Sequence, residues 1–386
     1  MKKRIIVTII LVLSVTAILF SLNIESVSAD ELSDNIEQGL ENIDLSELEK
    51  FYNENVKSDG RDFSETINSL LKGEYDFDYA SVTDYLLKLL LRDVFEMLPV
   101  FLGIIAISIL CVLINSVKGS FFGDGIADII VFVCSMSVVL MLSAEISLIW
   151  TNAKNTIQNI TILGEIMSPV ILTLMVASGG TVSASVYKPA VLFLTNGIMN
   201  IILDVVFPLI GITIIFSVAD SFNKSVKLAK FSATATSVIK WIIGLSFTIY
   251  GLFLSVQGIT SASFDGISIK AAKYAVSNSV PIVGGYLRDG FDLIVAGSVL
   301  IKNVVGISGV FALFFVVIVP VLHIAVTSVL LKFTAAFTGA LSDNGTSDLC
   351  ANFSNGITYI SAAVLSVGFM LFVTILLMIL SANAFL

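Results

Sequence analysis

The chain has 386 residues, of which 56% are hydrophobic and 13% charged, with a formal net charge of −9. This composition excludes a soluble globular protein, and the acidic balance argues against nucleic acid as a direct partner. Six apolar stretches are long enough, or nearly so, to cross a hydrocarbon layer of roughly 30 Å, which takes about 20 helical residues. They are 97–117, 126–149, 189–219, 238–258, 303–330 and 357–382. The sequence therefore predicts an all-α, polytopic helical bundle that lies in a lipid bilayer.

The N-terminal residues 1–29 have the organisation of a secretory signal peptide. A basic start at 2–4 precedes an apolar run over 5–22, and the small residues 27–29 suit a signal peptidase. The long apolar run leaves an uncleaved anchor helix as the alternative. Either way, we expect residues 30–96 to lie outside the cytoplasm.

Residues 30–96 differ sharply from the rest of the chain in charge. They contain eighteen acidic against six basic residues, a net charge of −12, whereas 97–386 have a net charge of +1. Apolar residues recur at helical spacing near Leu48 and again near Leu90, and the second helix is predicted to run into Pro99 and the first span. This acidic helical segment is too short for a large core. It is either a solvated region beside the membrane or a docking surface for a partner.

The membrane topology is predicted from lysine placement. The densest basic cluster after the N-terminus is Lys224, Lys227, Lys230 and Lys240, which should be cytoplasmic. An exported N-terminal segment then requires an odd number of crossings between Trp150 and Asp220. We expect 162–178, interrupted by Pro169, to be a re-entrant hairpin, so that 189–219 is the single crossing.

An internal repeat is suggested by a shift of 112 residues. The shift aligns Pro169 with Pro281, Gly197 with Gly309 and Pro208 with Pro320. The repeat units would be 126–220 and 238–332, within a membrane domain spanning 97–386. Because both units start in the same orientation, the repeat would be parallel, with helix breaks or re-entrant elements at the four prolines. Chance agreement in apolar sequence is the alternative.

Few residues suit catalysis or cofactor binding. His323 is the single histidine, and the three cysteines, Cys111, Cys134 and Cys350, are far apart in the sequence and form no CxxC motif. No nucleotide-binding glycine loop is present either. We therefore expect a protein that is not an enzyme and needs neither a cofactor nor a metal.

Polar residues within apolar spans are the remaining functional candidates. Asn196, Asn200 and Asp204 share one helix face, with Asp204 near mid-span, whereas Lys302 and Asn303 begin the fifth span. A charge in hydrocarbon costs about 2.5 kcal/mol or more, so such groups usually face protein or water. They indicate a polar lining or an interhelical ion pair, for example Asp204 with Lys302. Lys302, like Glu145 and Glu165, is close enough to a span end for snorkelling to be the alternative.

The chain resembles the stage III sporulation protein AE family of endospore-forming Firmicutes over nearly its whole length. The resemblance rests on the order of signal peptide, acidic segment and polytopic region, and on specific short runs. These runs are Ser168 to Leu172 followed by Gly179-Gly180 and Lys188-Pro189, Ser268 to Lys273 with Pro281 to Gly284, and Leu300 to Gly306.

The resemblance implies a mother-cell membrane subunit of the channel-like complex that links mother cell and forespore during spore development. Ring-forming membrane proteins and a secretion-type ATPase would be its partners. A self-sufficient secondary transporter with a site at the repeat interface is the alternative, supported by the repeat, the prolines and Asp204. An intramembrane enzyme has the least support, because no nucleophile–base pair is evident.

Overall fold

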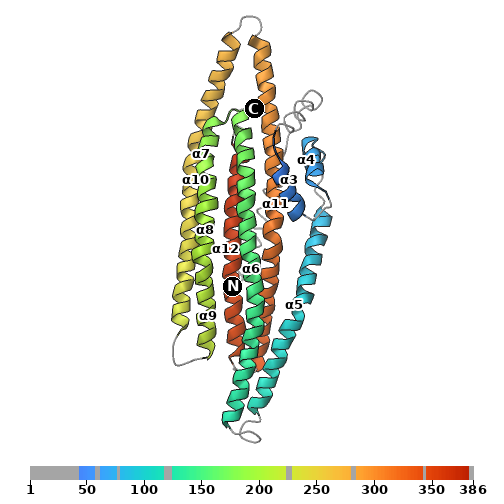
Figure 1. The fold of residues 1–386 in the computed structure, drawn as a ribbon, viewed down its shortest axis with the longest axis vertical. Helices are drawn as coiled ribbons and strands as arrows, with labels where there is room; N and C mark the ends of the chain where they lie inside the picture. Colours follow the sequence, from blue (N-terminus) through green and yellow to red (C-terminus); the bar gives the residue numbers. More distant parts are fainter. Residues whose placement is uncertain are drawn as a thin grey trace.

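The computed structural model describes residues 43–56, 61–75, 79–116, 124–222, 228–279, 284–341 and 345–381, and all regular structure within these ranges is helical. The predicted signal peptide at 1–29 lies outside the described residues. The helices are α3 (Ser46–Asn55), α4 (Phe63–Leu71), α5 (Tyr79–Ser116), α6 (Asp124–Ala177), α7 (Thr181–Leu192), η1 (Phe193–Ile198), α8 (Met199–Ile201), η2 (Ile202–Val206), α9 (Phe207–Phe222), α10 (Ala229–Ser279), α11 (Gly284–Leu341) and α12 (Thr346–Leu380). The predicted all-α bundle is confirmed (Figure 1).

Six candidate membrane spans are present in the described residues. They are Ala80–Ile114, Ile129–Ala177, Thr181–Phe222, Ala229–Ser255, Ile294–Leu341 and Thr346–Leu380. Several helices are much longer than a bilayer requires: the 54 residues of α6 extend for about 80 Å. The bundle therefore projects beyond the hydrocarbon layer.

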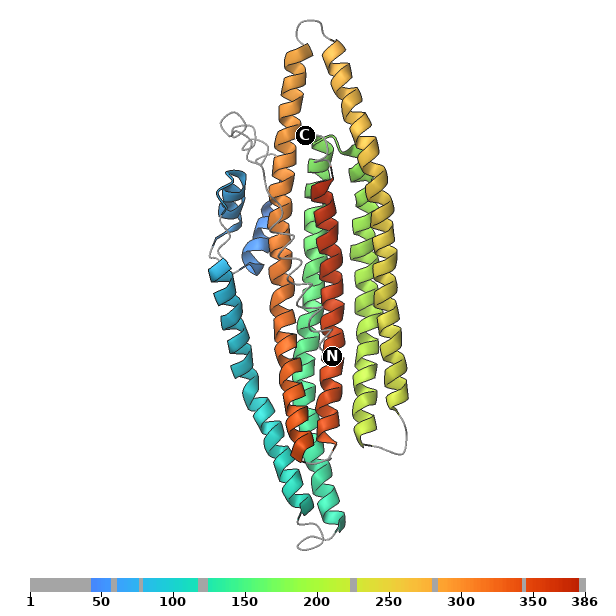
Figure 2. The same cartoon turned by 180° about the vertical axis from the view of Figure 1, so that it is seen from behind.

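The centre of the bundle is formed by α11 and α12, which pack against each other and against α6. Most of the apolar residues in these two spans are buried, whereas the other four spans leave most of theirs on the outside. The continuous stretch α7–α9 packs with α10 on one side of this centre, and α5 lies on the other side (Figures 1 and 2). This arrangement suits a bundle whose outer helices face lipid or other proteins.

The N-terminal acidic segment is attached to the bundle rather than separate from it. Helices α3 and α4 contact α11, and Tyr52 and Phe63 meet edge to face at 5.5 Å in a small apolar core. Asp62 caps α4 by accepting a hydrogen bond from the Glu65 amide at 2.8 Å. As predicted, the second helix of the segment runs through Pro99 into the first span, because α5 is continuous from Tyr79 to Ser116.

The re-entrant hairpin predicted over 162–178 is wrong. Helix α6 runs through Pro169 and ends at Ala177, so one long helix replaces a span followed by a hairpin. Proline has no N–H to donate to the Glu165 carbonyl, yet α6 continues without a break, packed against α11 and α12. Two candidate spans, Ile129–Ala177 and Thr181–Phe222, now precede the lysine cluster, and the topology inferred from that cluster stays a prediction.

Two of the other three predicted proline breaks, at Pro208 and Pro320, do not occur in the structure. Pro320 lies inside α11, so no break occurs there. Pro208 follows directly on the π-helical segment η2, which widens the helix without ending it. Pro281 lies outside the described residues, between the end of α10 and the start of α11.

The proposed repeat has matching helix directions but not matching helix ends. In both units a long helix is followed by a second long stretch of helix that returns (Figure 1). A shift of 112 residues would carry the α6 end at Ala177 to residue 289, yet α10 ends at Ser279 and residue 289 lies within α11. The repeat stays a prediction, and the helix ends do not follow its register.

Helix α10 holds the start of α7 through a buried aspartate. The Asp265 carboxylate accepts hydrogen bonds from the backbone amides of Val182 at 2.9 Å and Ser183 at 3.1 Å. Amides at a helix N-terminus are free to bind an anion, and the helix dipole favours it there. This contact fixes the position of α7–α9 along the axis of α10.

The pairing of α5 with α6 makes a prediction that tests the fold. The Cys111 and Cys134 thiols, one on each helix, lie close enough to interact with each other. Mild oxidation of the membrane-bound protein is expected to join them in an intramolecular disulfide, leaving Cys350 as the single thiol for a maleimide after denaturation. Mass spectrometry of the alkylated protein would identify the bond. A Cys111→Ser variant is the control, and three free thiols after oxidation of the parent would contradict this helix pairing.

Candidate functional site

The predicted polar face of the third span lies on the outside of the bundle. Asn196, Asn200 and Asp204 are all exposed, whereas their neighbour Met199 is buried and accepts a hydrogen bond from Thr161 of α6. The Asn200 amide donates to the Asn196 carbonyl at 2.7 Å along the ridge. We call these three exposed residues the polar ridge. It does not line an interior path within a single copy of the chain.

Lys302 and Asn303 take separate positions in the interior. Lys302 is fully buried and donates a hydrogen bond to the Ser381 carbonyl at the end of α12. The Asn303 side-chain oxygen is buried, and no hydrogen bond reaches it within the described residues. Because Asp204 is exposed on the outer face, the ion pair considered between Asp204 and Lys302 does not form.

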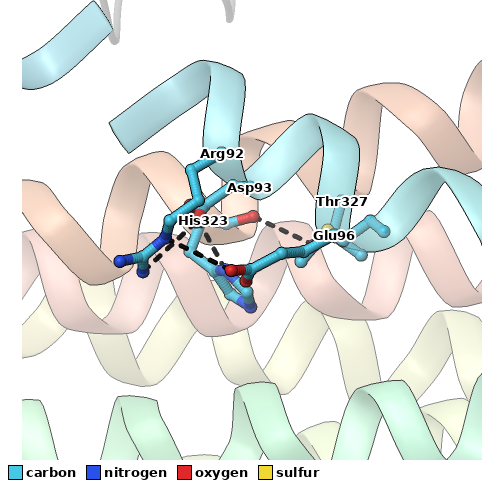
Figure 3. A network of polar contacts seen from close by, with 6 residues as sticks. Arg92, Asp93, Glu96, His323 and Thr327 are labelled. Carbon is cyan, nitrogen blue, oxygen red and sulfur yellow. Dashed lines mark hydrogen bonds and ion pairs between the residues drawn. The ribbon is translucent and has the colours of Figure 1, made fainter. Parts of the chain in front are cut away.

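A different group of ionisable side chains meets inside the bundle. His323 of α11 lies 3.3 Å from Asp93 of α5, measured from Nδ1 to Oδ2, and the Asp93 side chain is only 4% exposed (Figure 3). Next to Asp93 on the surface of α5, the Arg92 guanidinium is 3.5 Å from the Glu96 carboxylate. Thr327, one turn after His323, donates to its carbonyl at 3.0 Å. The network therefore ties α5 to the central helix.

Glu145 of α6 adds a second carboxylate to this group. It interacts electrostatically with His323. Its Oε1 atom and the His323 Nε2 atom are both buried, and no hydrogen bond reaches either within the described residues. We call Asp93, His323 and Glu145 the imidazole–carboxylate cluster, because they bring one histidine and two carboxylates together from three helices.

Sequence reasoning did not identify this cluster. Asp93 belongs to the acidic segment predicted at 30–96, where it is one of eighteen acidic residues, and Glu145 is close enough to a span end to snorkel. The signal that was available is the single histidine within an apolar span, since ionisable residues at such positions are usually functional. Its partners could not be identified without knowing which helices neighbour α11.

The residue types of the cluster suit the binding of a proton. A histidine between two carboxylates can hold a proton on either ring nitrogen, and a buried atom without a hydrogen bond favours the uptake or release of a proton. Within the described residues, no group of three His, Cys, Asp or Glu side chains is arranged to hold a metal ion.

These features define a polytopic helical membrane protein with an ionisable cluster inside the bundle and a polar ridge outside it. The chain belongs to the stage III sporulation protein AE family, whose family model matches residues 61–382. It is similar to the stage III sporulation protein AE of Bacillus subtilis (strain 168), with 26% identity over 280 residues that cover 72% of this chain and 70% of the relative. No solved structure matches the chain.

Proposed function

We propose that this protein is a non-enzymatic membrane subunit of the complex that connects mother cell and forespore across their envelopes during endospore development. The observation that carries the proposal is the family match over residues 61–382, which includes all six candidate membrane spans. A sporulation protein built almost entirely of membrane helices acts at a membrane. A channel-like or export-like assembly is the role that this combination supports best.

The polar ridge supports membership in a larger assembly. Asp204 is near the middle of the 42-residue span Thr181–Phe222 and is exposed beside the exposed apolar residues Ile201 and Val205. A carboxylate facing hydrocarbon at that depth costs about 2.5 kcal/mol or more. Hydrogen-bond donors on a neighbouring subunit, or a water-filled passage between subunits, would remove that cost.

We infer the orientation from the two ends of the bundle. Helices α3 and α4 lie toward the end where α6 meets α7, and α9 ends and α10 begins at the opposite end (Figures 1 and 2). The lysine cluster around Lys230 belongs to that opposite end and favours the cytoplasm. The acidic segment would then lie outside the mother-cell cytoplasm, in the space facing the forespore, where ring-forming proteins could reach it. The secretion-type ATPase would act from the cytoplasmic end.

The test is affinity purification of the tagged full-length chain from membranes of sporulating cells. We expect ring-forming membrane proteins and the secretion-type ATPase to co-purify, and spores to be absent when the gene is deleted. Recovery of the chain alone, combined with solute uptake by the pure protein in liposomes, would instead establish the secondary transporter.

The ridge itself is tested by Asp204→Leu. If the ridge meets partner subunits, this variant should lower partner recovery roughly tenfold, which corresponds to about 1.4 kcal/mol, at unchanged abundance in the membrane. If the ridge faces lipid, leucine should be tolerated better than aspartate and recovery should not fall. Ile215→Ala, at a 65% exposed apolar position of the same span, is the matched control. Equal recovery for both variants would contradict a partner at the ridge.

A further inference from the structure

We propose that the imidazole–carboxylate cluster is a proton-binding site, in which one proton is exchanged between His323 and Glu145 while Asp93 orients the imidazole ring. The ligand is a proton, and the site joins α5, α6 and α11. This proposal is independent of the role of the protein in a complex, since it concerns only groups within one chain.

The geometry assigns separate roles to the two ring nitrogens. Nδ1 faces the buried Asp93 carboxylate at 3.3 Å, and a carboxylate accepts hydrogen bonds, so Nδ1 carries a hydrogen. Nε2 then remains for exchange, and it is buried without a hydrogen bond, as is Oε1 of Glu145. A buried polar atom without a partner is costly, which favours the binding of a proton or a water molecule at these atoms.

The exchange step is a single proton transfer. The Nε2–H bond of the imidazolium breaks and an O–H bond forms on Glu145, which leaves a neutral imidazole and a carboxylic acid. The hydrogen bond between Nδ1–H and Asp93 is not broken, and the total charge of the cluster does not change. The uptake of a further proton from outside returns the imidazole to its charged form.

The charged surface of α5 lies beside the cluster. Arg92 and Glu96 have side chains 67% and 64% exposed, and the Arg92 guanidinium also lies 3.9 Å from the buried Asp93 carboxylate. These residues lie where the charged first half of α5 gives way to its apolar second half.

The charged groups facing His323 come from two of the helices packed against α11. They are Arg92, Asp93 and Glu96 on α5 and Glu145 on α6. Helix α12 contributes no charge at this level, because its single charged residue is Asp348 in its first turn.

The single histidine makes the site directly observable. We would label the full-length protein with ¹⁵N-histidine, purify it through a tag without histidine, and record its spectra in lipid nanodiscs between about pH 5 and 9. The ¹⁵N shifts report both the tautomer and the protonation of His323. We expect the signals to change over this range, and Glu145→Gln to move the midpoint of the change by about one pH unit or more.

Three further variants complete the experiment. Asp93→Asn should alter the balance between the two tautomers, because it removes the carboxylate that accepts from Nδ1. Asp84→Asn, at an exposed carboxylate paired with Lys88 on the same helix, should leave the spectra unchanged. Glu145→Asp retains a carboxylate and serves if the glutamine variant does not fold; we expect a midpoint different from the parent. The same midpoint in the parent and in both Glu145 variants, or no change with pH, would overturn the proposal.

Discussion

Gly306→Leu is expected to prevent most of the protein from reaching its folded state in the membrane. Gly306 lies where α11 crosses α12, and a Cβ atom built there would be 2.4 Å from Cγ1 and 2.5 Å from Cδ1 of Ile379. Isoleucine is stiff in a helix because its side chain branches at Cβ, so it has little freedom to move aside. Overpacking of this kind costs about 1–3 kcal/mol or more, and this helix pair is the most extensive in the bundle.

The effect should be measured as the yield of monodisperse protein after detergent extraction and as its thermal unfolding temperature. Gly297→Leu is the matched control, because it lies in the same helix and a Cβ atom added there would have no other atom within 4 Å. Gly368→Leu should behave like Gly306→Leu, since its Cβ would come within 2.8 Å of Val317 on the same interface. Similar yields for Gly306→Leu and Gly297→Leu would show that α11 and α12 do not pack in this way.

Lys302→Glu is expected to have the second large effect, again on folding. The ammonium group of Lys302 is fully buried and binds the Ser381 carbonyl directly after the last residue of α12. A positive charge is favourable at the C-terminal end of a helix, where carbonyl groups carry partial negative charge. A carboxylate in its place would face those oxygens without a donor, and a buried charge left uncompensated costs about 3–5 kcal/mol.

Lys302→Met separates the charge from the volume of the side chain. Methionine fills similar space but leaves the Ser381 carbonyl without this donor, so we expect a smaller loss of about 1–3 kcal/mol. Thermal unfolding of the purified variants should therefore rank parent, Lys302→Met and Lys302→Glu in falling order. An equal unfolding temperature for Lys302→Glu and the parent would rule out the contact between Lys302 and the end of α12.

The imidazole–carboxylate cluster and the polar ridge differ in how much their roles depend on what surrounds the protein. The imidazole–carboxylate cluster is enclosed by helices of the same chain, so its chemistry is accessible in the purified protein. The polar ridge is exposed at the level of a membrane span, so its role depends on what lies beside it. Asp93 and Asp204 are both carboxylates in candidate spans, yet the first is buried against His323 and the second faces outward.

The sequence by itself determined the class of the protein, the positions of the spans and the continuity of α5. Apolar runs of membrane length predict membrane-spanning helices, because a backbone in lipid must satisfy its hydrogen bonds within each helix. The charge contrast between residues 30–96 and the remainder follows from composition alone. The family, too, was recognisable from short local motifs.

Only the tertiary structure decided which residues meet. Pro169 predicts a break in isolation, but α6 continues through it, packed against α11 and α12. The shared face of Asn196, Asn200 and Asp204 was correctly predicted from helical periodicity, but periodicity does not say whether a face points inward or outward. Asp93 and His323 are 230 residues apart in sequence, and their contact exists only because α5 runs alongside α11. Side-chain spacing along one helix carries no information about the neighbour that it will meet, and that is why the cluster became visible only in the folded bundle.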